Sequence, residues 1–200
     1  MANKRGRRSF RRKAPQRSYR KLFIIATEGA KTEPTYFSMF HGGRNAVIRI
    51  KLLGSSTDSA PKQVLSRARM YVQDESLRRG DEVWLVIDKD SWNDKQLIEV
   101  FQECKKRRYF LAVSNPCFEY WLLLHFENGR GVTGARDCIV RLKKHLPNFS
   151  KDSFDPMKFR PHVKKAIGFA EEKDRPPCSD WPRSNGTTVY RLVKKLLEHE

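Results

Sequence analysis

Four short apolar runs, separated by segments with helical signals, constrain the fold of this chain more than any other feature. The runs are KLFIIAT (21–27), AVIRIKLL (46–53), VWLVI (83–87) and YFLAV (109–113). Their length and their β-branched and aromatic content are typical of buried strands. Because strands and helical segments alternate, the pattern predicts an α/β fold with a mostly parallel central sheet of about four strands, flanked by helices.

The segments between the runs carry the signals of helices. Thr32 is a candidate N-cap, with Pro34 at the first helical position. Residues 61–79 repeat apolar side chains at helical spacing and end at a glycine. Further helices are expected around residues 97–101 and within SNPCFEYWLLLHF (114–126).

The distribution of charge divides the chain into three parts. The net charge is +18, and residues 1–21 contain ten Lys or Arg and no acid, which leaves +8 for the rest. We expect residues 1–20 to be a basic disordered arm, 21–127 the α/β core, and 128–200 a mainly helical extension packed on the core. This excess of positive charge favours a polyanionic partner, most simply nucleic acid, although a solvated tail would have the same composition.

Several classes of protein are disfavoured by the sequence. The four cysteines lack a CxxC pair, which argues against a structural zinc site and a disulfide framework. The apolar stretch LFIIA is too short for a secretory signal, and no run approaches the ~20 apolar residues of a membrane span. We therefore expect a cytoplasmic protein with no membrane partner. The sequence does not specify an oligomeric state.

Acidic residues collect where the predicted strands end. Glu28 follows the first strand, Asp88 and Asp90 end the third, and Glu119 comes shortly after the fourth. Ligands of open α/β sheets bind beyond the carboxyl ends of the strands. Residues i and i+2 of a strand share a face, so both aspartates are expected to point the same way. If these strands are neighbours, the four carboxylates line one edge of the sheet.

Clustered carboxylates suit Mg²⁺ or Mn²⁺, and such ions support phosphodiester cleavage. Glu28 would then be a metal ligand or a general acid or base, and Lys31 would steady a phosphate. The plainer alternative is that Asp90 and Asp94 cap a turn or helix and that Glu33 is a first-turn acid. EGAKT is not a phosphate-binding loop, because GxxxxGK[ST] is absent.

Three motifs in order resemble the RloB family of bacterial defence proteins: IIATEGAKTEPTYF, DEVWLVIDKDSW and LAVSNPCFEYWLLLHF. The resemblance covers roughly residues 20–127, with a weaker echo in TTVYRLVKKLL. It implies a Toprim-like fold, which pairs a glutamate after the first strand with a DxD after a later strand. This pattern assigns the glutamate to Glu28 and the acidic pair to Asp88 and Asp90. Glu33 is a weaker candidate for an additional acid, and Glu119 looks specific to the family.

The resemblance also implies a partner ATPase of the ABC or AAA type and a role in abortive infection. Three functions remain open: a metal-dependent nuclease, a catalytically silent nucleic-acid-binding subunit, and a docking partner of the ATPase. The sequence fits RNA and DNA equally, and one metal or two. In the first two functions the basic arm grips phosphates, through Arg7, Arg8, Arg11, Arg12 and Lys13.

Overall fold

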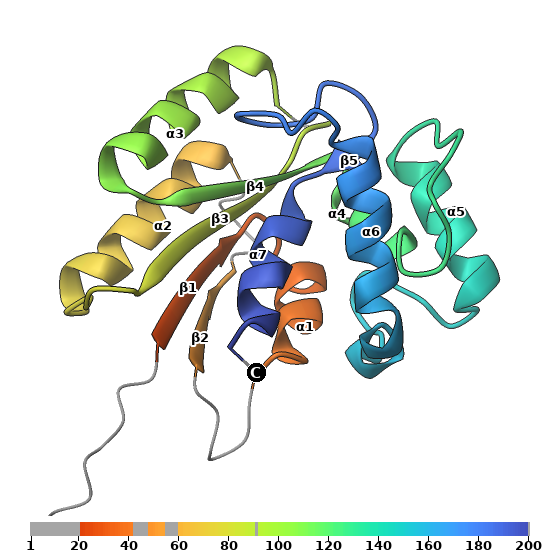
Figure 1. Cartoon of the computed structure of the whole chain (residues 1–200), viewed down its shortest axis with the longest axis horizontal. Coiled ribbons are helices and arrows are strands. Elements are labelled where there is room, and N and C mark those ends of the chain that lie inside the picture. Colours follow the sequence, from red (N-terminus) through yellow and green to blue (C-terminus); the bar gives the residue numbers. More distant parts are fainter. Residues whose placement is uncertain (1–20, 42–47, 55–59, 91, 200) are drawn as a thin grey trace, which may run out of the picture.

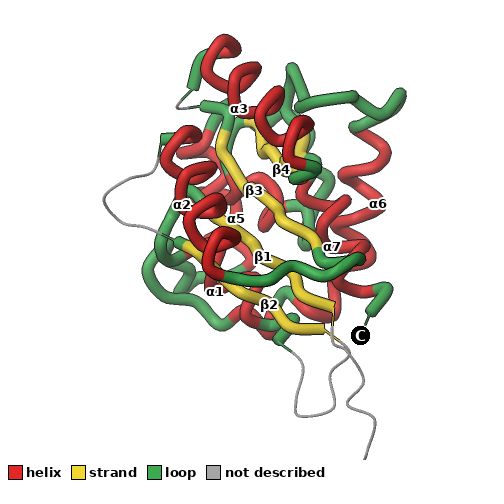
Figure 2. Tube along the Cα trace, turned by 90° about the vertical axis from the view of Figure 1, so that its left-hand side faces the viewer, coloured by secondary structure: helices red, strands yellow, loops and turns green. Residues whose placement is uncertain are grey.

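The computed structural model of the chain describes residues 21–41, 48–54, 60–90 and 92–199 (Figure 1). Its centre is one five-stranded sheet in the order β2-β1-β3-β4-β5 (Figure 2). The first four strands are parallel, and β5 runs antiparallel to β4. The strands are β1 (Lys21–Thr27), β2 (Ile48–Leu53), β3 (Glu82–Asp88), β4 (Phe110–Asn115) and β5 (Gly186–Thr187).

Helices cover both faces of the sheet (Figure 1). One face carries α2 (Pro61–Asp74) and α3 (Asp94–Arg107). The other side carries α1 (Thr32–Ser38), α4 (Phe118–Leu123), α5 (Ala135–His145), α6 (Val163–Lys173) and α7 (Val189–Leu197), with the short 3-10 turns η1 (Pro156–Lys158) and η2 (Arg160–His162). Among the described residues, no helix is both long and apolar enough to cross a membrane.

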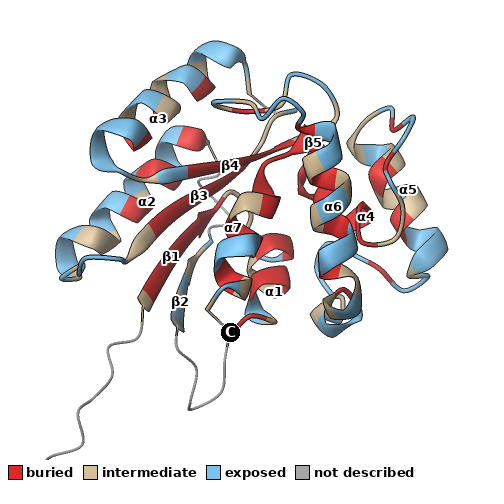
Figure 3. Ribbon diagram, viewed as in Figure 1, coloured by how far each residue is buried: buried red, intermediate tan, exposed pale blue. Residues whose placement is uncertain are grey.

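The central strands are buried on both faces, which explains their uninterrupted apolar sequences (Figure 3). In β1, Phe23 and Ile25 join the core beneath α1, α4 and α7, whereas Leu22, Ile24 and Ala26 join the core beneath α2 and α3. Side chains therefore alternate between two hydrophobic layers along a single strand. The two hydrophobic layers hold the sheet between the helices, and they thereby set the position of the edge where the parallel strands end.

The predicted α/β fold with a mostly parallel sheet is confirmed, with one strand more than expected. The additional strand β5 has only two residues, too few to produce a periodic signal, and it pairs Thr187 with Ser114 and Gly186 with Asn115. The helix α7 packs on β4. Residues 128–199 thus add a strand and a helix directly to the sheet.

Two predicted helix boundaries are wrong. The helix expected over residues 61–79 ends at Asp74, with Glu75 as its extended C-cap. The first helix begins at Thr32, with Lys31 as its N-cap, so Thr32 is not the cap and Pro34 is not the first helical residue. The Thr32 hydroxyl instead donates to the carbonyl of Lys151, at 3.1 Å. The capping oxygen is thereby used for a tertiary contact. The predicted arm, residues 1–20, lies outside the described residues.

Candidate active site

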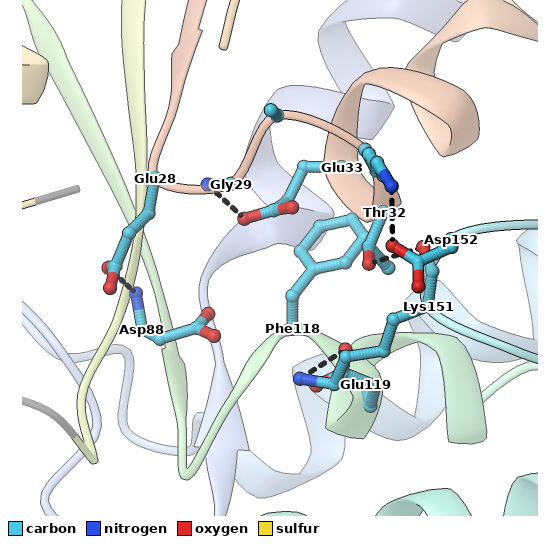
Figure 4. Close-up of a pocket in the computed structure, with 11 residues that line it drawn as sticks. Glu28, Gly29, Thr32, Glu33, Asp88, Phe118, Glu119, Lys151 and Asp152 are labelled. Atoms are coloured by element: carbon cyan, nitrogen blue, oxygen red, sulfur yellow. Dashed lines mark hydrogen bonds and ion pairs between the residues drawn. The ribbon is translucent and has the colours of Figure 1, made fainter. Parts of the chain in front are cut away.

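A cavity of about 380 Å³ opens at the carboxyl edge of the sheet (Figure 4). Among the carboxylates that line it are Glu28, Glu33, Asp88 and Glu119. We call this cavity the carboxylate pocket. The same cavity is lined by two lysines, Lys31 and Lys151, and by Asp152 and Phe118.

Parallel pairing of neighbouring strands brings the first two acids together. Thr27 of β1 pairs with Val86 of β3, and the Glu28 amide continues the ladder by donating to the Val86 carbonyl at 3.1 Å. Glu28 therefore leaves β1 beside the end of β3, where Asp88 stands. Glu119 reaches the same edge from the first turn of α4, after β4. The topological expectation that acids gather beyond the carboxyl ends of parallel strands describes this arrangement.

The Glu28 carboxylate is held by donors from β3 and from the segment after it. Its Oε2 accepts from the Asp88 amide at 3.0 Å, and the Trp92 indole Nε1 donates at 3.1 Å to both oxygens. Burial raises the pKa of Glu28 to about 7. The hydrogen bonds from Asp88 and Trp92 oppose this shift, and the charges of Glu33 and Asp90 add to it. At neutral pH this carboxyl is divided between its two protonation states.

Glu33 folds back under the loop that follows β1. It is only 5 % exposed, and its Oε1 accepts from the Gly29 amide at 3.0 Å. A Cβ on residue 29 would stand 2.6 Å from Glu33 Oε2, so a larger residue there would displace the Glu33 carboxyl. Burial raises the pKa of Glu33, and the nearby charge of Glu119 adds to the shift. The side chain is thus a buried pocket acid, in addition to lying in the first turn of α1.

Asp88 and Glu119 each present an oxygen that has no hydrogen-bond donor. Within the described residues, Asp88 Oδ1 and Glu119 Oε2 are buried and without a partner. Burial raises the pKa of Asp88 well above its usual range, and the charges of Glu33, Glu119, Glu28 and Asp90 raise it further. Figure 4 shows the carboxyl groups of Glu33, Asp88 and Glu119 turned toward a common space. An unsatisfied buried oxygen is costly, so both atoms would gain from a donor or a cation.

Asp90 is not part of the pocket lining. The strand β3 ends at Asp88, and the chain turns at Lys89, so the alternation of strand side chains does not continue to Asp90. The Asp90 amide donates to the Pro116 carbonyl at 3.0 Å, and the residue is exposed. Its charge still reaches the pocket, where it raises the pKa values of Glu28 and Asp88.

Two lysines lie on the α1 side of the pocket. Lys31 is 63 % exposed at its side chain and pairs with Asp152 at 2.9 Å. Lys151 Nζ pairs with Glu119 Oε1 at 2.9 Å. Burial alone would lower the pKa of Lys151, but the charge of Glu119 and the hydrogen bond to it outweigh burial and raise that pKa.

Sequence reasoning missed Trp92, Lys151 and Asp152. Trp92 stands two residues after the DxD motif, so its proximity in sequence was a usable signal. Lys151 and Asp152 lie in a loop more than 100 positions from the first strand, and nothing in the surrounding stretch NFSKDSF (148–154) distinguishes them from ordinary surface residues. The candidate phosphate-binding residues of the arm, Arg7, Arg8, Arg11, Arg12 and Lys13, lie outside the described residues.

The pocket has the donor chemistry of a divalent-cation site, but its ligand set is incomplete as it stands. Within the described part of the chain, no three acidic, His or Cys side chains stand close enough together to hold one metal ion. Both Glu28 oxygens accept from N–H groups, and Glu119 Oε1 accepts from Lys151. Among the described residues, Asp88 Oδ1 and Glu119 Oε2 are the buried oxygens of the pocket that have no partner and so are available to a cation.

Comparison with known proteins adds the family. A family model described as RloB-like protein matches residues 23–196. The chain belongs to the RloB-like family. No curated protein and no solved structure matches it. The RloB-like match includes both the strands that carry the acids and the segment that carries Lys151, so the whole carboxylate pocket falls within the family's common region.

Proposed function

We propose that this chain is a divalent-metal-dependent nuclease, which cleaves phosphodiester bonds in RNA or DNA. The observation that carries the proposal is the convergence of Glu28, Glu33, Asp88 and Glu119 in one pocket, where Asp88 and Glu119 each have a buried oxygen that lacks a donor. A fold gains no stability from such a group of anions. Selection for stability alone would replace them, so their presence argues for a cationic ligand.

The donor set fits Mg²⁺ or Mn²⁺, which prefer carboxylate oxygen over nitrogen or sulfur. Asp88 and Glu119 would hold the ion through their unpartnered oxygens, with Glu33 and Glu28 beside them. A divalent ion bound there would supply charge neutralisation at the scissile phosphate and acidify an attacking water. Asp90, outside the pocket lining, would act through its charge on Glu28 and Asp88.

Glu28 is the proposed general acid or base. A catalytic group works best when its pKa lies near the working pH, and burial brings the pKa of Glu28 to about 7. Its two N–H donors, the Asp88 amide and the Trp92 indole, fix the carboxyl in one orientation. Lys31, with an exposed side chain among the residues that line the pocket, is the proposed contact for a substrate phosphate.

We further propose that the nuclease is the effector of a bacterial phage-defence system of the abortive-infection type, with an ABC or AAA ATPase as partner. Support comes from the resemblance to RloB proteins and from membership of the RloB-like family. The absence of a GxxxxGK[ST] motif from the sequence agrees with ATP hydrolysis by a separate subunit. A nuclease that acts on host nucleic acid requires control, which the partner would supply.

A second candidate is a nucleic-acid-binding subunit without catalytic turnover. One observation favours it: no three of the described acids form a complete ligand set for a metal. The net charge of +18 would then provide the whole function, through contacts to phosphates. This candidate predicts affinity that falls steeply with salt and no cleavage with any metal.

The deciding experiment incubates the purified chain with labelled tRNA, single-stranded DNA and duplex DNA, each with Mg²⁺, Mn²⁺ or EDTA. Asp88→Asn and Glu28→Gln are the test variants, and Asp74→Asn is the matched control. Asp74 is an exposed acid at the end of α2, the end of that helix that precedes the start of β3 and so lies away from the pocket. All variants are first compared by circular dichroism and thermal unfolding.

We expect metal-dependent cleavage that Asp74→Asn leaves unchanged. Glu28→Gln should lower the rate by about 10²- to 10⁴-fold, as is typical for loss of a general acid or base. Asp88→Asn should lower it by at least about 10²-fold. Binding of nucleic acid without cleavage, in the presence and absence of the ATPase, would support the second candidate instead.

A further inference from the structure

The turn formed by residues 150–153 reaches across the sequence to the carboxylate pocket. Ser150 and Ser153 form an isolated antiparallel bridge, and their amides and carbonyls exchange hydrogen bonds at 3.2 Å. Lys151 and Asp152 form the tip of this turn, and both line the pocket. We call residues 150–153 the latch turn.

Three contacts hold the tip of the latch turn against the first loop and α4. Lys151 Nζ pairs with Glu119 Oε1 at 2.9 Å, and Lys31 Nζ pairs with Asp152 Oδ1 at 2.9 Å. The hydroxyl of Thr32 donates to the Lys151 carbonyl at 3.1 Å. Figure 4 shows the Lys151 side chain extending to Glu119, with Asp152 next to it at the tip. The tip therefore closes one side of the cavity.

Lys151 places a positive charge on the same carboxylate that a metal ion would use, at Oε1, whereas the unpartnered oxygen is Oε2. Glu119 is 2 % exposed, and one of its oxygens binds the ammonium while the other has no donor. An ammonium and a divalent ion placed on one carboxylate repel each other, so each weakens the binding of the other. In the closed arrangement the buried acids are partly neutralised by the protein's own cation.

We propose that Lys151 is an internal counter-cation that competes with the divalent ion for Glu119, and that the latch turn is an autoinhibitory element. The divalent ion binds Glu119 more tightly when the tip of the turn withdraws Lys151 from that carboxylate. This inference rests on the proposed function, because it concerns how the metal enters the same pocket.

The architecture of the latch turn suits such a motion. Its flanks are anchored, since Phe149 is buried and Phe154 packs against Phe149 and Phe159, with ring centroids 5.4 and 5.5 Å apart. Of the two ion pairs at its tip, Lys31 with Asp152 is exposed on both sides and contributes little stability. The tip is therefore held mainly by Lys151, whose partner Glu119 is buried, so release of Lys151 frees the tip while its base stays in place.

The test measures the affinity of the full chain for Mn²⁺ alone and Mg²⁺ alone, by isothermal titration calorimetry and by the shift in melting temperature. Lys151→Met removes the ammonium and keeps the length of the side chain. Lys158→Met is the matched control, because Lys158 is an exposed lysine of the neighbouring 3-10 turn and does not line the carboxylate pocket. A Lys151→Met/Glu119→Gln double variant locates any gain at Glu119.

We expect Lys151→Met to bind Mn²⁺ about 10- to 100-fold more tightly than the wild type, the range that corresponds to a charge-assisted hydrogen bond. Lys158→Met should match the wild type, and the double variant should lose the gain. Asp152→Asn keeps Lys151 but frees the tip from Lys31, and should tighten binding by about 2- to 5-fold. This variant keeps the proposal testable if Lys151→Met fails to fold.

Equal or weaker Mn²⁺ binding by Lys151→Met and Asp152→Asn would overturn the latch while leaving the proposed metal site intact. A gain that persists in the double variant would also overturn it, because the competition would not occur at Glu119. Absence of binding by the wild type and every variant would overturn the metal-dependent function, and the latch with it. The behaviour of the wild type separates these failures.

Discussion

The protein contains two buried acidic centres with opposite chemistry. In the carboxylate pocket, Asp88 and Glu119 each keep a buried oxygen without a donor, and the surrounding acids raise the pKa of Asp88. The other centre is Asp174, which follows α6 and is 7 % exposed. Both centres bury carboxylates, and only their partners differ.

Asp174 is saturated with donors from the chain that follows it. Its Oδ2 accepts from the Tyr190 hydroxyl at 2.8 Å and from the Arg191 guanidinium at 2.6 Å, while Oδ1 accepts from the Cys178 amide at 2.8 Å. Burial would raise the pKa of Asp174, but these hydrogen bonds outweigh it and lower that pKa. This carboxylate ties the Pro-rich loop and α7 to α6.

The difference indicates how to distinguish a structural acid from a functional one. A carboxylate that supports a fold is ionised and fully hydrogen-bonded, so its removal costs stability. A carboxylate kept among other acids weakens the fold until a cation or a proton arrives. Asp174 is a carboxylate of the structural kind, and the carboxylates of the pocket are of the functional kind.

The largest expected effect on stability comes from Asp174→Asn. This change leaves the partly buried Arg191 without its carboxylate, so we expect the free energy of unfolding to fall by about 3 kcal/mol. Urea denaturation followed by circular dichroism measures the change. A loss below about 0.5 kcal/mol would remove the distinction between the two centres.

Divalent metal should stabilise the wild type through the pocket alone. At a Mn²⁺ concentration 100 times the Kd, the free energy of unfolding should rise by about 2.7 kcal/mol. Asp88→Asn should lose this gain. Asp174→Asn should show the same gain, although its free energy of unfolding without metal is lower than that of the wild type. Equal gains in the wild type and Asp88→Asn would place the metal elsewhere.

The stability of the metal-free protein should decrease as pH rises. Glu28 has a folded-state pKa of about 7, above its ordinary 4.5, so the folded state binds more protons than the unfolded state between these values. The free energy of unfolding therefore falls from about pH 4.5 to pH 7, and stays low above pH 7. Glu33 and Asp88, whose pKa values are also raised, act in the same direction.

Glu28→Gln removes the part of this slope that belongs to Glu28. In EDTA at pH 8 the variant should be more stable than the wild type by about 1 to 2 kcal/mol, after allowance for solvent screening. At pH 4 the two should unfold alike. If the difference in stability between Glu28→Gln and the wild type does not change with pH, burial does not disfavour the ionised form of Glu28.

The smallest expected change is a gain from Asp88→Asn in EDTA. Neutralising Asp88 relieves repulsion from its acidic neighbours, so the free energy of unfolding at pH 8 should rise by about 1 kcal/mol. The sign is opposite to that of Asp174→Asn, which is the sharpest form of the comparison. Thermal unfolding of both variants in one buffer measures it.

Much of the fold followed from local sequence. The apolar runs at 21–27, 83–87 and 109–113 predicted the buried parallel strands, because a strand covered on both faces needs apolar residues at every position. The two-residue strand β5 escaped prediction because pairing with β4 defines it, rather than any periodicity of its own. The role of Thr32 also depends on a distant partner: its hydroxyl donates to the Lys151 carbonyl instead of capping the helix, and local sequence does not reveal that contact.

The sequence by itself determined which acids stand at strand ends, because parallel strands bring their carboxyl ends to one edge. Glu28 and Asp88 meet there, and Glu119 joins them. Only the tertiary structure decided that Asp90 leaves the pocket, that Glu33 is buried in it, and that Lys151 reaches Glu119. The contacts of the latch turn with Lys31 and Thr32 join residues 121 and 119 positions apart. Local periodicity contains no information about such pairs, because the packing of α1 and α4 against the sheet creates them.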